Sequence, residues 1–253
     1  MMQKRLDELV EKLKKAHGPG LQSVVLYGSA ASGDFQEKHS DLNVICVLAE
    51  IGTRQLRDSE AVFRWWRDLG YPAPLLLTAE EIRTSADCFA LEFSDILEAH
   101  RILAGTNPFV GVEIGDRDYR ARVEHELRTK LLRLRQKAAG IMEDRPLLLR
   151  LMTDSVATFC VLLRHALALM GEPRKFSKRD VVEQARLKLG IDAQPFLTLL
   201  DLREDKIKPR GLEATPLLAS YLKEVQAVIA AVDQLGRRPR LDETPQVEGD
   251  PAQ

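Results

Sequence analysis

Two short apolar segments joined by a loop that begins with Gly-Ser constrain the fold of this chain most strongly. Residues 22–27 (QSVVLY) and 41–48 (DLNVICVL) are rich in β-branched and aliphatic side chains, so each predicts a buried strand. The first segment runs directly into Gly28 and Ser29. Glycine lets the backbone approach a phosphate, and the N–H groups of such a strand-to-helix turn face an anion. An ordinary tight turn remains the alternative.

The second segment carries a pair of candidate metal ligands. Asp41 and Asn43 stand two residues apart, so on a strand both side chains lie on one face of the sheet, while Leu42 and Val44 lie on the other. Mg²⁺ prefers oxygen ligands, and it takes one or two carboxylates together with phosphate oxygens and water. The alternative is that Ser40 and Asp41 only form the turn into the strand.

At these residues the chain resembles the nucleotidyltransferase superfamily of DNA polymerase beta and kanamycin nucleotidyltransferase. The family motif is a strand, Gly-Ser, a further glycine, and Asp-x-Asp on the next strand. Here it is matched by Gly28, Ser29, Gly33 and Asp41, with a divergent Asn43 in place of the second aspartate. The resemblance covers roughly the first 115 residues.

The resemblance implies a Mg²⁺-dependent enzyme that moves a nucleoside monophosphate from a nucleoside triphosphate, such as ATP, to a hydroxyl of a small molecule or protein. It implies that the nucleotide is bound by Gly28, Ser29, Gly33 and Ser40. Asp41 would be catalytic and, with Asn43, would bind the metal. The acceptor is not identified by the sequence.

Asn43 weakens this expectation, because an amide offers a carbonyl oxygen to Mg²⁺ but no charge. The family places a third carboxylate on a later strand, and the expected third strand at 75–78 has none. Glu92, on a predicted strand at 88–93, is the best substitute as a catalytic and metal-binding residue; a rim glutamate paired with an arginine is the alternative. Asp95 is a weaker candidate. A catalytically impaired nucleotide-binding or partner-binding protein on the same fold is therefore the competing function.

The fold class that we predict is α+β. An N-terminal nucleotidyltransferase-like mixed sheet with flanking helices spans residues 1–116, a helical bundle spans 117–237, and a polar tail spans 238–253 and is expected to be disordered. Helical signals include the spacing of Leu6, Leu9, Val10 and Leu13, the capping pair Thr78 and Glu81, and Pro146 and Pro195 in first turns.

Composition makes some partners less favoured than others. Lysines and arginines number 37 against 38 aspartates and glutamates. Because the chain has no overall positive charge, we do not expect a membrane partner, and a nucleic-acid partner is unfavoured. The bundle's first helix is basic, which fits either a phosphate contact or a solvated face. The apolar stretch 146–170 contains charged residues, and three cysteines without C-x-x-C spacing favour buried thiols. We therefore expect a cytoplasmic protein. His39 and His100 receive no role.

Overall fold

The computed structural model describes residues 2–32, 42–175 and 177–235. The predicted mixed sheet is present, with the strand order β3-β2-β1-β4. β1 is antiparallel to both β2 and β4, whereas β3 is parallel to β2. The strands are β1 (Leu21–Tyr27), β2 (Asn43–Leu48), β3 (Leu75–Thr78) and β4 (His100–Gly105).

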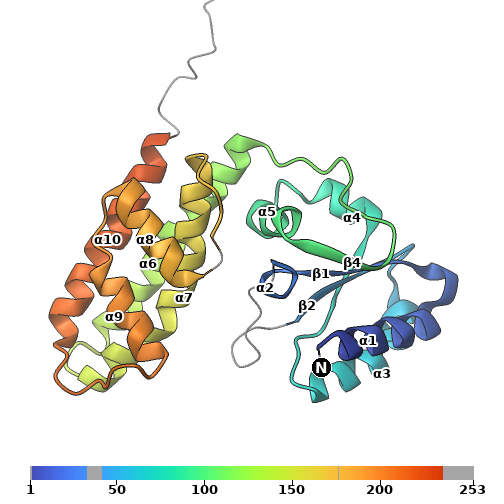
Figure 1. Cartoon of the computed structure of the whole chain (residues 1–253), viewed down its shortest axis with the longest axis horizontal. Helices are drawn as coiled ribbons and strands as arrows, with labels where there is room; N and C mark the ends of the chain where they lie inside the picture. The colour runs from blue at the N-terminus through green and yellow to red at the C-terminus, as the bar shows by residue number, and fades with distance from the viewer. Residues whose placement is uncertain (1, 33–41, 176, 236–253) are drawn as a thin grey trace, which may run out of the picture. The chain divides into compact units, whose positions relative to one another are not determined.

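Helices make up most of the rest of the described chain (Figure 1). A 3₁₀ turn, η1 (Gly18–Gly20), joins α1 to β1. The helices are α1 (Met2–His17), α2 (Ser29–Ser32), α3 (Thr53–Asp68), α4 (Ala79–Thr84), α5 (Ala90–Glu98), α6 (Asp116–Ala139), α7 (Arg145–Leu169), α8 (Lys178–Leu189), α9 (Gln194–Arg203) and α10 (Ala214–Leu235).

The described residues form two compact units. Unit 1 consists of Met1–Val123 and Pro173–Val181, and unit 2 consists of Glu124–Glu172 and Val182–Gln253. The division falls within α6 and again within α8. The domain limits predicted from the sequence at 116 and 237 stay predictions.

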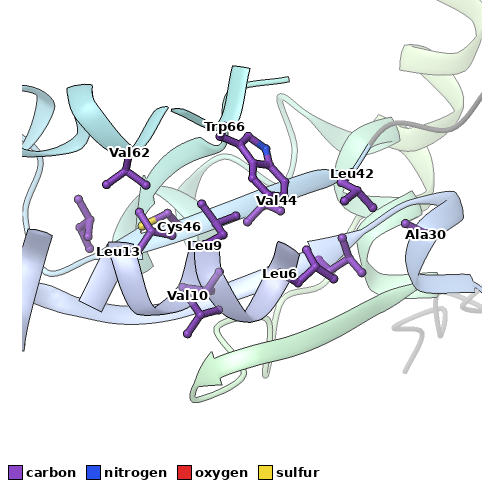
Figure 2. Packing of buried hydrophobic residues seen from close by; sticks show 13 residues of the cluster. Leu6, Leu9, Val10, Leu13, Ala30, Leu42, Val44, Cys46, Val62 and Trp66 are labelled. Carbon is purple, nitrogen blue, oxygen red and sulfur yellow. The ribbon is translucent and has the colours of Figure 1, made fainter. Parts of the chain in front are cut away.

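One face of the sheet in unit 1 is covered by α1 and α3, as Figure 2 shows. The apolar stripe of α1 predicted from the sequence is buried there, against Val44 and Cys46 of β2 and Trp66 of α3. Burying an aliphatic side chain contributes about 1.5–3 kcal/mol. The stripe therefore fixes which face of each strand points toward the two helices.

The other face of the sheet packs against α5 and the loop that follows β4. Val25 of β1 and Ile45 of β2 form a second buried cluster with Phe93, Ile96 and Phe109. From Val24 to Tyr27 of β1 and from Val44 to Leu48 of β2, successive residues therefore enter opposite clusters.

Three helix starts follow the predicted chemistry. Thr78 Oγ1 accepts a hydrogen bond from the Glu81 backbone N–H at 3.1 Å, and the Glu81 carboxylate accepts from the Thr78 N–H at 2.7 Å, which confirms the capping box. Pro146 and Pro195 lie in the first turns of α7 and α9, as predicted.

Unit 2 is built around α7, which packs against α9 and α10. The ring of Tyr221 meets Phe159 at 5.7 Å and Phe196 at 5.1 Å between centroids, and its hydroxyl lies 3.2 Å from Ser155 Oγ. By length and composition α7 is the one described helix that could cross a membrane. That is weak evidence, because the core helix of a soluble protein has the same length and apolar character.

The expectation of three buried thiols is partly wrong. Cys46 and Cys160 are buried, but Cys88 is exposed. Burial raises the pKa of the Cys46 thiol to about 12, because a thiolate is poorly solvated among apolar side chains. Cys88 lies outside both apolar clusters because the segment that carries it is a turn and not the strand predicted there.

Candidate functional site

The turn after β1 requires glycine. Gly28 has φ +78°, a region that side-chain-bearing residues rarely adopt. Its N–H donates to the Ala99 carbonyl at 3.3 Å, and its carbonyl accepts from the Ala31 N–H at 2.9 Å. The prediction of free N–H groups is therefore wrong for Gly28 itself. The N–H groups of Ser29 and Ala30 open α2 and have no intrahelical partner, as in any helical first turn.

Asn43 lies directly across the sheet from the end of β1, where its Cα pairs with that of Tyr27. Leu42 and Val44 are buried in the cluster under α1, and Ile45 enters the opposite cluster. Asn43 therefore occupies the face that carries α5, and the predicted alternation is confirmed for residues 42–45.

The Asn43 amide also lies close to the turn. A Cβ built on Gly28 would be 3.4 Å from Asn43 Nδ2, which is van der Waals contact. The structure thus brings two of the predicted residues together at one end of β1. Gly33, His39, Ser40 and Asp41 lie outside the described residues. The side chain of Ser29 is not described either.

Glu92 lies on a helix, so the predicted strand at 88–93 is wrong. Residues 90–98 form α5, whose buried face is made by Ala90, Leu91, Phe93 and Ile96. Alternation over so few residues also fits a helix, and Phe89, which a half-buried strand would bury, is 51% exposed. Glu92 is exposed and precedes Ile96, a member of the cluster on this face of the sheet, by about one turn.

The carboxylate of Glu92 nevertheless lies near enough to Tyr27, the last residue of β1, to act on it electrostatically. Burial raises the pKa of the Tyr27 phenol, and the negative charge of Glu92 raises it further. Glu92 is exposed, and it forms no ion pair with a described residue. The arginine-paired alternative is therefore not seen within the described chain. Gly28, Asn43, Tyr27 and Glu92 form what we call the β1-end site.

The oxygen donors of the β1-end site suit a hard divalent cation but are few. Asn43 offers an amide oxygen and Glu92 one carboxylate, and β3 contributes no acid. Within residues 2–32, 42–175 and 177–235, no group of three His, Cys, Asp or Glu side chains could hold a metal ion. Mg²⁺ binds through one or two carboxylates plus substrate phosphates, so these donors fit it only together with Asp41.

Arg174 is a residue that the sequence analysis missed. Its guanidinium contacts the Asp95 carboxylate at 2.9 Å, the Tyr119 hydroxyl at 3.0 Å and the hydroxyl of Ser94, and only 10% of its side chain is exposed. Asp95 is thus engaged by Arg174. The cluster joins α5, the start of α6 and the 173–181 segment within unit 1. A sequence separation of 79 residues gives no local signal for this contact.

The sequence context of His100 suggested a helix. In the structure His100 is instead the first residue of β4. Its Nδ1 lies 2.8 Å from the Ile96 carbonyl oxygen, and its ring meets Phe109 edge-on at 5.3 Å between centroids. The strand itself was not predicted, because HRILAG is short and follows the helical residues of α5 directly.

The basic face of α6 is partly neutralised. Arg128 pairs with Glu124 at 2.8 Å, and Lys130 pairs with Glu126 at 3.7 Å. Both are i,i+4 pairs on a helix surface, each worth about 0.3–0.5 kcal/mol. These contacts favour the solvated-face interpretation of this helix over a phosphate contact.

Two cavities lie elsewhere in the described chain. One of about 410 Å³ lies between α6 and α10 in unit 2, lined in part by Leu132 and Arg135. Another of about 340 Å³ lies in unit 1, where α1 ends and α3 begins, beside His17 and Asp58. Neither is lined by a residue of the β1-end site.

The fold is that of a nucleotidyltransferase. The structure resembles that of the spectinomycin adenyltransferase AAD(9) from Enterococcus faecialis, solved with ATP and spectinomycin. The TM-score is 0.57 at 12% sequence identity, covering 91% of this chain and 99% of that one. This confirms the predicted fold class.

Two toxin–antitoxin structures match less well. A mutant MntA-HpeT structure has a TM-score of 0.28 and 17% identity, covering 40% of this chain and 74% of that one. A toxin–antitoxin structure with AMP-PNP has a TM-score of 0.28 and 16% identity, covering 55% of this chain and 96% of that one. No family model and no curated protein matches the sequence.

Proposed function

We propose that this chain binds a nucleoside triphosphate at the β1-end site and transfers its nucleoside monophosphate to a hydroxyl of a small molecule or protein. The observation that carries the proposal is that the Asn43 amide lies next to the Gly28 turn, so that a Cβ on Gly28 would be 3.4 Å from it, in a nucleotidyltransferase fold with Glu92 near enough to act on Tyr27. The spectinomycin adenyltransferase with the same fold was solved with ATP and spectinomycin.

In this proposal the N–H groups that follow Gly28 donate hydrogen bonds to phosphate oxygens, and Asp41, Asn43 and Glu92 would hold Mg²⁺. Bound there, the ion would offset the charge of the triphosphate and polarise the phosphate under attack. Tyr27 pairs with Asn43 on one side and His100 on the other, and it packs against the apolar cluster on the α5 face.

The second candidate is a nucleotide-binding protein without turnover. The absence of a carboxylate from β3 and the amide at Asn43 favour it. Disturbing even an outer partner of a metal site costs about 10–100-fold in affinity or activity, and a missing ligand charge should cost at least as much.

Pyrophosphate release from ATP with Mg²⁺ separates the two candidates. For an active enzyme we expect release by the wild type and its loss in Asp41→Ala. For an inactive one, release is expected only in Asn43→Asp. Asn107→Asp is the matched control, because Asn107 lies in the loop after β4 and caps the Phe109 N–H. Release that is unchanged in Asp41→Ala would place the chemistry elsewhere.

A further inference from the structure

His100 lies beside the turn that the proposed function uses. Its Cα pairs with that of Tyr27, which pairs with Asn43 on the other side of β1. The residue before it, Ala99, accepts the hydrogen bond from the Gly28 N–H. Adjacent strands lie about 4.8 Å apart, so His100 is about 10 Å from Asn43 along the sheet. Its ring packs on Phe109, a member of the cluster on the α5 face.

The hydrogen bond to Ile96 fixes the tautomer of this histidine. A carbonyl oxygen only accepts, so the Nδ1–H of His100 donates to the Ile96 carbonyl at 2.8 Å. In the neutral ring the proton is then on Nδ1, and Nε2 carries a lone pair. Nε2 has no hydrogen-bond partner among the described residues, and the side chain is half-buried. The edge-on contact with Phe109 holds the ring plane.

We propose that His100 is the general base of the transfer, an inference that rests on the proposed function. Its Nε2 takes the proton of the acceptor hydroxyl as that O–H bond breaks. The acceptor oxygen forms a bond to the α-phosphorus. The bond from the α-phosphorus to the oxygen bridging the β-phosphate breaks, and pyrophosphate leaves with that electron pair.

The other side chains near the end of β1 are poor candidates for the general base. An amide does not accept a proton as a carboxylate does, so Asn43 is not a base, and β3 supplies no acid. Glu92 is assigned to the metal, and Asp95 is held by Arg174. Histidine is the general base most often used in proteins, and Nε2 of His100 has no hydrogen-bond partner among the described residues.

The test compares the full chain with His100→Asn and His100→Gly. Asparagine keeps an N–H donor for the Ile96 carbonyl but has no basic nitrogen. Pyrophosphate release from ATP and Mg²⁺ is measured with water and with glycerol as hydroxyl probes. ATP binding is measured on the same samples by calorimetry, and folding by tryptophan fluorescence. His125→Asn, on the exposed surface of α6, is the control.

We expect both variants to bind ATP as the wild type does and to lose about 10²–10⁴-fold in release rate. Added imidazole should restore release in His100→Gly and leave His125→Asn unchanged; a purely structural histidine would not be rescued. Equal rates in wild type and His100→Asn would overturn the proposal, and so would ATP binding with no release by the wild type. Failure of ATP to bind would instead refute the proposed function.

Discussion

Arg174 gives the sharpest test of how unit 1 holds α5 and therefore Glu92. Its nearly buried guanidinium contacts Asp95 at 2.9 Å and the Tyr119 hydroxyl at 3.0 Å. Removing one partner of a buried ion pair costs about 3–5 kcal/mol, because the other charge is left behind. Asp95 and Tyr119 keep further contacts, so for Arg174→Ala we expect the lower end, about 3 kcal/mol.

The assay follows from where the fluorophores lie. Both tryptophans of the chain, Trp65 and Trp66, are in α3 of unit 1, so their fluorescence in urea reports the unfolding of that unit. With a slope of about 2 kcal/mol per molar urea, the midpoint should fall by about 1.5 M.

The control is Arg83→Ala. Arg83 pairs with Glu80 on α4, with side chains 65% and 67% exposed, and such surface pairs contribute about 0–1 kcal/mol. Arg174→Lys should fall between the two, because an ammonium does not span the same partners. A midpoint shift for Arg174→Ala no larger than that for Arg83→Ala would refute the reasoning.

Two further predictions concern the sheet and the site. Gly105 and Gly111 have φ +78° and +77°, but a Cβ on Gly105 would lie 1.9 Å from a backbone oxygen, whereas one on Gly111 meets nothing within 4 Å. Gly105→Ala should therefore destabilise unit 1 in urea well beyond the roughly 1–2 kcal/mol of left-handed strain expected for Gly111→Ala; equal effects would contradict this. Glu92→Gln should lower the raised pKa of Tyr27, as measured by NMR titration of ring-labelled tyrosine, while Glu98→Gln on the same helix should not. The sign follows because the carboxylate disfavours a neighbouring phenolate.

Local patterns predicted much of the fold. The stripe of α1 and the Thr78 capping box depend on neighbours within one or two turns, so periodicity and capping chemistry identified them. Segment 88–98 was harder, because periodicity over so short an apolar run does not distinguish a strand from a helix. There packing decides, since Phe93 and Ile96 together enter the cluster under the sheet.

The part of the candidate site that depends on local patterns was also predicted from the sequence. Alternation along the second strand placed Asn43 on the correct face of the sheet, and the Gly-Ser pair after the first strand placed a turn at Gly28. Contacts between residues distant in sequence had no local signal: the Arg174 cluster joins segments 79 residues apart, and the Ala99 carbonyl takes the Gly28 N–H only after β4 has paired with β1.

The most direct test of the nucleotide site is calorimetric titration of the full chain with ATP in the presence and absence of Mg²⁺, with Asp41→Ala beside the wild type. We predict that ATP binds the wild type, that binding requires Mg²⁺, and that Asp41→Ala abolishes it. Absence of binding under any metal condition, or binding that is unchanged in Asp41→Ala, would contradict the assignment of the β1-end site.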